Sequence, residues 1–462
     1  MADLLKDNTN KALISMSLPI SLGMLSTFLF QVIDTYFVGQ LGAAPLAALS
    51  FSSTLYFTIV ALFIGLSVGV SILVGQGVGK KEWGKVKSNA GLGILVSLIL
   101  GILLSGLCIL LIDPLFSTLG AEEQLIPMIK EYTIPLLIGI PILTSGLMIG
   151  AVLRATGNIK KPEIIMAFAG IINLILDYLL IFGKFGFPEL GIKGAAYATV
   201  ISWLFVIVGM VILLIQDKLW SISDIIQAQI KKEVSNIFKL SGPTILTQVI
   251  GPITLMFLTY LLARHSTLAV AAFGVASRIE TLLMIGILGV STAITPFIAQ
   301  NAGANKKDRI EAAIKFGGKA STYLGLIMAT ILFLFIKPIA TIFNDNSEII
   351  AHTSNYFYIV GLSYIFYGLF LITTSILNGL QLTLDSFKIS LIKSLLFSVP
   401  LTIIGSFWGI NGIFIGISMG NILAGVYASI RMKKEFKKTY SSLSTANIRR
   451  EYWDDIKHMF KK

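Results

Sequence analysis

Long apolar runs separated by short polar breaks recur from residue 12 to residue 430. A helix needs about 20 mostly apolar residues to cross roughly 30 Å of hydrocarbon, and these runs are of that order. A membrane β-barrel would instead show short segments of alternating polarity. We therefore predict an all-α membrane protein. Its twelve expected spans are residues 13–38, 46–74, 90–112, 128–153, 162–183, 194–215, 237–262, 268–298, 316–336, 355–378, 390–407 and 411–430.

The longest polar break, residues 216–236, divides the chain into two halves of six expected spans. An ungapped shift of 224 residues aligns Pro, Gln and Gly positions of the two halves, which argues against chance apolar similarity. The aligned pairs include Ser17 and Ser241, Pro19 and Pro243, Gly65 and Gly289, Gln76 and Gln300, and Gly79 and Gly303. Six spans return each half to the same side, so the repeats are parallel. Transporters built from such repeats bind substrate between them near the midplane.

These features predict an N-lobe at residues 1–215, a cytoplasmic linker at 216–236, a C-lobe at 237–435 and a basic cytoplasmic tail at 436–462. The chain is 55% apolar and only 13% charged, against about 25% charged in typical soluble domains. With both termini in the cytoplasm, nearly all of the 36 Lys and Arg fall on the cytoplasmic side. The exceptions are Lys130, Lys184, Lys193, Arg264 and Lys337 in outside loops and Arg278 within a span. The net charge of +12 therefore reflects membrane topology, and no nucleic-acid partner is expected.

Two carboxylates lie within the spans of the first half. Asp34 is near the outer end of span 1. An ionised side chain inside a membrane helix costs about 2.5–3.5 kcal/mol. Asp177 lies at a similar depth in span 5, with Asn173 one turn away on the same face, and Thr199 lies at that depth in span 6. These four groups could form an oxygen-rich site for H⁺ or Na⁺. The alternative is that they only hydrogen-bond helices to one another.

The repeat favours a functional role for this cluster. The second-half counterparts of Asp34, Asn173 and Asp177 are Leu258, Leu391 and Leu395. A purely packing role would not explain so consistent a difference in polarity between the halves. Two carboxylates that share a dry site would retain a proton near neutral pH through desolvation and mutual repulsion. We predict that transport is coupled through protonation or cation binding at Asp34.

Other polar and flexible residues suggest a substrate cleft. Glu280 either contacts a cationic substrate or pairs with a basic group on another span, and it does not face Arg278, two residues away. Methionines suit varied ligands, although ordinary packing is the alternative. The expected cleft residues are Gln31, Tyr36, Gln248, Met256, Glu280 and Met284. Lys393 is expected near a cytoplasmic end, with its ammonium extending to the membrane surface.

Pro19 interrupts the hydrogen-bond ladder of span 1 and predicts either a hinge coupled to Asp34 or a static kink. The single cysteine, Cys108, excludes an intrachain disulfide. No HExxH, GxSxG or phosphate-loop motif is present, so the sequence does not indicate an enzyme.

Several short motifs in order resemble the MATE (multidrug and toxic compound extrusion) family, in its prokaryotic DinF-like branch. They are SLP…D…FVGQLG in span 1, AALSF and GQGVGKKE in span 2, LRATGNIKKP at 153–162, NLILDY at 173–178 and GIKGAAYAT at 191–199. The resemblance implies two six-helix lobes around a V-shaped central cleft, in a prokaryotic cytoplasmic (inner) membrane. It also implies alternating access, with organic and often cationic drugs leaving as H⁺ or Na⁺ enters. Asp34 would be the cation-linked carboxylate, with Asn173, Asp177 and Thr199 as partners, and as ligands if the ion is Na⁺.

The resemblance has gaps. Other branches carry a coupling Glu early in span 7, which TILTQVIGP lacks, and LNGLQL lacks the basic residue of its counterpart LRATGN. We expect a monomer with no cofactor other than the coupling ion. The alternatives are a flippase for lipid-linked precursors, disfavoured by the acidic interior charges, and a channel.

Overall fold

The computed structural model describes residues 4–440, which form an almost entirely helical protein. Twelve segments of this part are long and apolar enough to cross a membrane, which confirms the number of spans predicted. The helices are α1 (Thr9–Gly39), α2 (Ala43–Lys80), α3 (Trp83–Leu110), α4 (Ile112–Thr118), α5 (Ile126–Ala155), α6 (Lys160–Phe182), α7 (Ile192–Gln216), α8 (Ile222–Ile226), α9 (Ile230–Ala263), α10 (Thr267–Gly303), α11 (Lys307–Phe343), α12 (Ser347–Val360), α13 (Tyr364–Gly379), α14 (Thr383–Ile392), α15 (Val399–Ser406) and α16 (Gly409–Tyr440).

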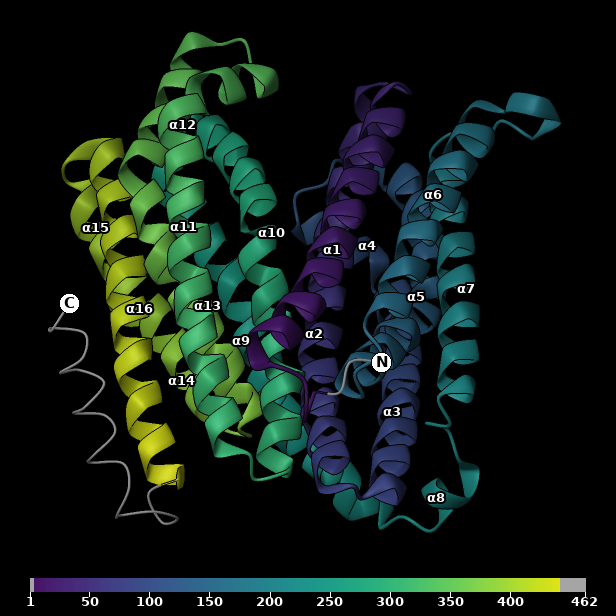
Figure 1. The fold of residues 1–462 in the computed structure, drawn as a ribbon. Coiled ribbons are helices and arrows are strands. Elements are labelled where there is room, and N and C mark those ends of the chain that lie inside the picture. Colours follow the sequence, from purple (N-terminus) through teal and green to yellow (C-terminus); the bar gives the residue numbers. More distant parts are fainter. Residues whose placement is uncertain (1–3, 441–462) are drawn as a thin grey trace, which may run out of the picture.

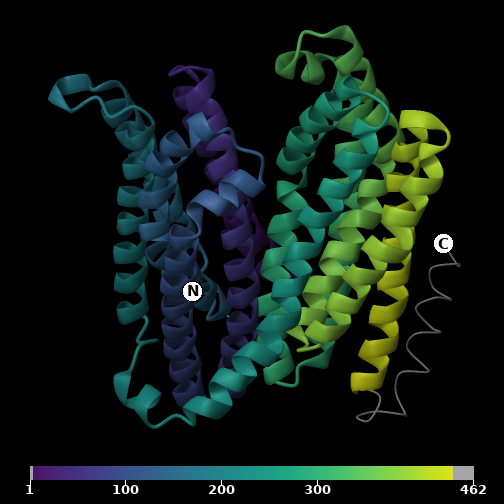
Figure 2. The same cartoon turned by 180° about the vertical axis from the view of Figure 1, so that it is seen from behind.

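The helices form two lobes of six spans, which approach each other at one end and diverge toward the other in a V shape (Figures 1 and 2). The N-lobe contains α1–α7 and the C-lobe contains α9–α16, and each lobe has its own apolar core. We call the end with α8 and the turns after α2 and α10 the basic end, and the opposite end the open end. Residues 441–462 of the expected tail lie outside the described residues.

Several helices extend beyond the spans expected from hydrophobicity. For example, α2 continues through the polar GQGVGK stretch to Lys80, and the tenth span begins at Ser347. Hydrophobicity marks the part of a helix in lipid, whereas polar turns can continue the same helix into water. The eleventh span, Thr383–Ser406, shows the largest consequence. It begins seven residues earlier than expected, so Lys393 lies near its middle and the expectation of a cytoplasmic end was wrong.

Glycines bring the two lobes into direct contact at the basic end. A Cβ on Gly79 of α2 would collide with the backbone carbonyl of Gln300 in α10, and one on Gly303 would collide with that of Gln76. Between α2 and α9, Thr244 Oγ1 donates to the carbonyl of Gly65 at 2.6 Å. Close backbone approach is possible only where no side chain intervenes. The glycines aligned by the sequence repeat are therefore the interlobe contacts.

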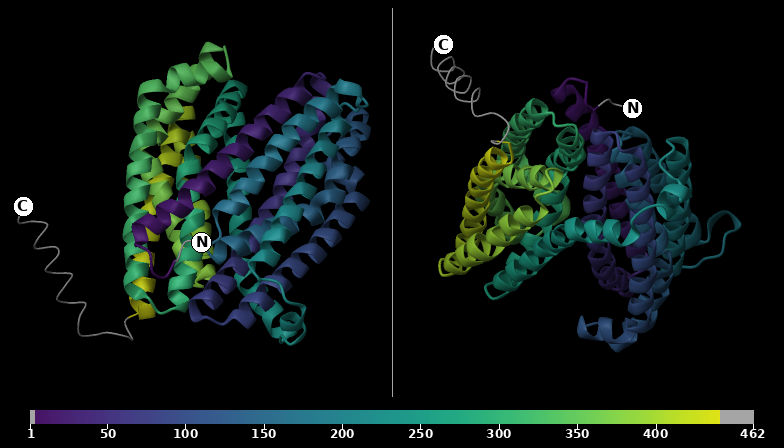
Figure 3. Two further views of the ribbon diagram at one scale, coloured as in Figure 1. Left: turned by 45° about the vertical axis from the view of Figure 1, so that its right-hand side comes forward. Right: turned by 90° about the horizontal axis from the view of Figure 1, so that it is seen from below.

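Helix α1 packs against both lobes (Figure 3). Its first half, including Leu13 and Met16, lies in an apolar cluster formed largely by C-lobe residues. The preceding Leu4 is 2% exposed, and its carbonyl accepts hydrogen bonds from Asn301 Nδ2 at 3.1 Å and Arg309 Nη2 at 3.0 Å. The second half of α1 packs against α6 of the N-lobe. The chain thus crosses from one lobe to the other within α1.

The linker between the lobes docks on α3 at the basic end. Ile225 of α8 packs against Gly91, where a Cβ would collide with it. Lys87 Nζ lies 3.7 Å from Asp224 Oδ2, and Ser88 donates to Glu233. The observed linker is shorter than the expected one at 216–236, because α9 already begins at Ile230.

Candidate functional site

Helices α1, α6 and α7 bring the predicted cation site together in the N-lobe. Asn173 Nδ2 lies 3.4 Å from Asp177 Oδ1 and 3.5 Å from Thr199 Oγ1. Asp34 lies close enough to Asp177 for the two carboxylates to repel each other when both are charged. Asp177 is 1% exposed. The four residues therefore lie together in one site, in which Asp177 is buried and the other three are half-buried, and its role in cation binding stays a prediction.

Two carboxylate oxygens of this site lack hydrogen-bond partners. Asp34 Oδ1 and Asp177 Oδ2 are both buried, and neither bonds to any other group in residues 4–440. Buried carboxylate oxygens are normally hydrogen-bonded, because an unsatisfied one costs free energy. A proton bound by either carboxylate, or a small cation between them, would satisfy these oxygens.

The sequence analysis did not single out two nearby tyrosines, of which Tyr132 lies close to the two carboxylates and Tyr56 lies close to Tyr132. Tyr132 of α5 is 5% exposed and lies within electrostatic reach of Asp34, Asp177 and Tyr56. Tyr56 of α2 stacks on the indole of Trp203, with ring centroids 5.9 Å apart. The repeat carried a signal for both tyrosines, because the 224-residue shift aligns Tyr132 with another tyrosine and Tyr56 with Glu280.

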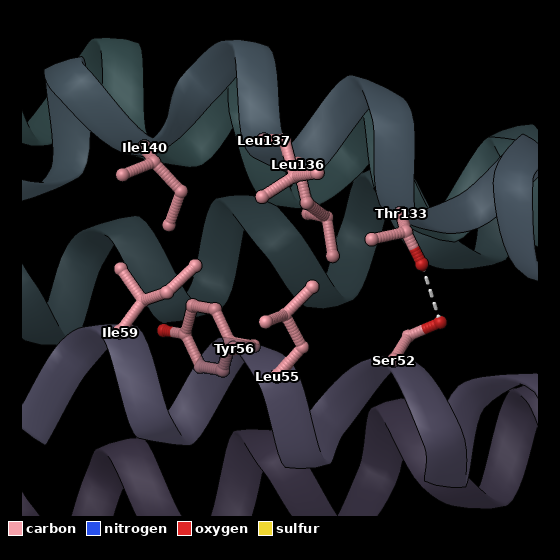
Figure 4. Close-up of a pocket in the computed structure, with 8 residues that line it drawn as sticks. All are labelled: Ser52, Leu55, Tyr56, Ile59, Thr133, Leu136, Leu137 and Ile140. Carbon is pink, nitrogen blue, oxygen red and sulfur yellow. Dashed lines mark hydrogen bonds between the residues drawn. The ribbon is translucent and has the colours of Figure 1, made fainter. Parts of the chain in front are cut away.

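A small cavity of about 10 Å³ lies between α2 and α5, next to Tyr56. Figure 4 shows its lining side chains facing one another across the two helices, with Ser52 Oγ and Thr133 Oγ1 hydrogen-bonded at 2.6 Å. The other lining residues are Leu55, Ile59, Leu136, Leu137 and Ile140. This space holds about one water molecule and is far too small for a drug-sized molecule.

The residues expected in the substrate cleft differ in how exposed their side chains are. Gln31, Tyr36 and Met256 are exposed on α1 and α9, and Gln248 is half-buried. Met284 differs from the expectation, because it is 4% exposed in the C-lobe core and lines no open space. Whether a methionine is buried or exposed depends on which face of its helix packs against a neighbouring helix. The sequence alone does not determine that face.

Glu280, the sixth expected cleft residue, points into the C-lobe. Its Oε2 accepts hydrogen bonds from Tyr356 Oη at 2.7 Å and Tyr364 Oη at 3.1 Å. Lys393 exerts an electrostatic attraction on it. A basic group on another span thus lies near enough to attract Glu280, and contact with a cationic substrate stays a prediction.

Lys393 lies in a π-helical turn, Lys393–Ser398, between α14 and α15. Its Nζ lies 4.7 Å from the ring centre of Tyr367 and 5.3 Å from that of Phe370. The ammonium is therefore held by aromatic rings inside the lobe rather than at the membrane surface. Single π turns often occur at functional sites.

Pro19 lies inside α1, which is continuous from Thr9 to Gly39. It also lines a groove of about 520 Å³ at the basic end, together with Asn8, Asn10, Lys11, Ile14, Ser15, Leu18 and Lys160. Four residues farther along, Gly23 touches the side chain of Glu163, whose Oε1 is 3.1 Å from Arg154 Nη1. The proline is thus placed where α1 passes between the lobes.

Two repeated six-span lobes, joined at one end and carrying carboxylates with buried oxygens inside one of them, are the architecture of a membrane transporter. The MatE family model matches residues 19–179 and 243–404, one match in each lobe. The chain belongs to the MATE family, whose members are transporters and not enzymes.

Named relatives cover nearly the whole chain. It is 32% identical over 441 residues to a Shewanella oneidensis protein named FAD transporter. The match covers 94% of this chain and 98% of the relative. It is 27% identical over 374 residues to a Thermotoga maritima protein named probable multidrug resistance protein NorM, covering 80% of this chain and 79% of the relative. Its fold matches the Vibrio cholerae MATE transporter VcmN in the bent form with a TM-score of 0.90 and 28% identity, over 94% of this chain and 99% of that one.

Proposed function

We propose that this chain is a secondary active antiporter that exports small organic molecules in exchange for H⁺ or Na⁺ bound at Asp34 and Asp177. One observation carries the proposal, namely the two buried carboxylate oxygens without partners. Asn173 and Thr199 complete the site, as partners of a protonated carboxylate or as ligands of Na⁺. We favour H⁺, because a single proton shared by two carboxylates removes their repulsion without further ligands.

Ion binding would act on the lobes through α1. Asp34 lies in the half of α1 that packs on the N-lobe, and Pro19 lies in the half that packs in the C-lobe cluster. Loss of charge at Asp34 would permit closer packing of the outer half of α1 on α6, with a bend at Pro19. The similarity to VcmN in the bent form supports this hinge.

The cargo has two candidate classes. Relatives named multidrug resistance proteins support organic cations, and the relative named FAD transporter supports an anionic dinucleotide. A lipid-precursor flippase has no such support among these relatives. We further propose a monomer in the prokaryotic inner membrane with both termini in the cytoplasm.

Everted membrane vesicles with imposed pH and Na⁺ gradients, varied separately, test the coupling. Cargo accumulation should follow the pH gradient in vesicles with the unaltered chain and disappear with Asp34→Asn. Accumulation driven by Na⁺ alone at fixed pH would overturn the preference for protons. Unchanged accumulation in Asp34→Asn under either gradient would overturn the proposed coupling site.

A further inference from the structure

Arg278 lies on the face of α10 that looks toward the N-lobe. Ile285 and Gly289, on the same face, contact α1, where Ser21 Oγ donates to the carbonyl of Ile285 at 3.3 Å. Arg278 precedes Gly289 by eleven residues, which is about three helical turns, so the two share a face. The lobes diverge toward the open end, where α10 begins (Figures 1 and 2), and Arg278 lies in the half of α10 nearer that end. It is therefore placed on the face of α10 that borders the space between the lobes.

The surroundings of Arg278 are open. Arg278 is exposed, and among residues 4–440 it has no hydrogen bond, ion pair or ring contact. Gly274 and Thr281, one turn before and after it, are also exposed, and a Cβ on Gly274 would meet nothing within 4 Å. A charged residue at membrane depth without a partner is costly and usually functional. Room for a ligand exists on both sides of this guanidinium.

Two acids of the spans near this space, Glu280 and Asp177, are turned away from it. Glu280 follows Arg278 by two residues, which places it on the opposite side of α10, bonded to Tyr356 and Tyr364. Asp177 is buried inside the N-lobe, where it faces Asp34. The charge that α10 presents to the space between the lobes is therefore positive.

We propose that Arg278 recognises an anionic group on the cargo, a phosphate or carboxylate held by the guanidinium in a bidentate contact. The inference rests on the proposed export function and names its substrate class. Organic anions would bind between the lobes at α10, while the carboxylates of the N-lobe take the coupling cation. A soluble phosphate ester and a lipid headgroup offer the same chemistry to Arg278.

Purified protein in phosphatidylcholine vesicles with an imposed pH gradient provides the test. The probes are flavin adenine dinucleotide, riboflavin as the same ring system without phosphate, tetraphenylphosphonium as a cation, and a fluorescent phosphatidylglycerol. The variants are Arg278→Gln and Arg278→Lys. Arg264→Gln, an exposed arginine at the end of α9, is the matched control.

Arg278→Gln should lower transport of the dinucleotide at least about tenfold, with riboflavin little changed and Arg278→Lys intermediate, since Lys lacks the bidentate fork. A loss confined to phosphatidylglycerol would support phosphate recognition with lipid as its source. Equal losses for all probes, no loss for either anion, or transport of only the cation by the unaltered chain would overturn the inference. If no probe moves under any gradient, the export function fails. Binding of the dinucleotide to detergent-solubilised protein then still tests Arg278.

Discussion

Gln300 of the C-lobe donates a hydrogen bond from its side-chain amide to the backbone carbonyl of Ala155 in the N-lobe, over 2.6 Å. Its repeat partner in the N-lobe, Gln76, makes a corresponding contact with the C-lobe. The Oε1 of Gln76 accepts a hydrogen bond from Gln381 Nε2 at 2.7 Å. Each glutamine thus reaches the end of the fourth span of the other lobe. The alternating access that we propose requires the basic end to open, and in that mechanism these two bonds would break and re-form in every transport cycle.

Replacement of Gly79 by leucine should disrupt this closed end. The side chain would collide with the backbone of Gln300, which cannot move without separating α2 from α10. We expect transport to fall at least about tenfold, with a shift toward a conformation open at the basic end. Accessibility of a cysteine at position 76 to a charged maleimide, in a chain whose Cys108 is replaced by alanine, would report the shift. Gly106→Leu is the control, because nothing lies within 4 Å of a Cβ there. Full transport in Gly79→Leu would contradict this account.

A disulfide across the same end should lock it. In the chain lacking Cys108, Gln76→Cys and Gln381→Cys would place two thiols at an interlobe contact. Oxidation should abolish transport, and reductant should restore it, because the lobes could no longer separate there. Each single cysteine variant should keep its activity under oxidation. Continued transport by a fully crosslinked protein would show that the basic end need not open at this point.

The sequence predicted the features that depend on apolar run length and on the internal repeat, but not those that depend on how helices pack. The number of spans follows from apolar run length, and the contacts of Gly65, Gly79 and Gly303 were marked by the repeat. The depth of Asp34 and Asp177 followed from span position. The position of Lys393 within its span did not, because the charged Asp385 and Lys388 conceal the start of that span. The direction in which Met284 points depends on helix rotation, which only tertiary packing determines.

The two carboxylates of the N-lobe should act as one unit. Asp34→Asn and Asp177→Asn each replace a carboxylate of the shared site with an amide that cannot bind the proton. Each should lower gradient-driven transport by about a hundredfold or more, and the double variant should be little worse than either single one. Initial rates of dye or flavin accumulation in vesicles measure this, with Asn10→Asp, an exposed change outside the site, as the control. Multiplicative losses would indicate that the carboxylates act independently.

Removal of Tyr132's hydroxyl tests whether the tyrosine supports the site. Tyr132→Phe keeps the buried ring and its packing but removes a hydroxyl that α5 brings near the carboxylates. The expected result is unchanged thermal stability with a changed pH profile of transport, a readout that a packing role would not alter. Tyr358→Phe, at an exposed position of α12, should change neither quantity. A pH profile that stays the same in Tyr132→Phe would limit this residue to packing.

Glu280 and Lys393 should depend on each other for stability. The carboxylate is held by two tyrosine hydroxyls and the ammonium by two rings, and each lies in the field of the other charge. Removing one partner leaves the other charge uncompensated inside the C-lobe, at a cost of about 3–5 kcal/mol. Glu280→Gln and Lys393→Met should therefore each lower the melting temperature in detergent, whereas the double variant should recover most of the loss. Additive losses in the double variant would show that the two charges are stabilised separately, each by its own aromatic neighbours.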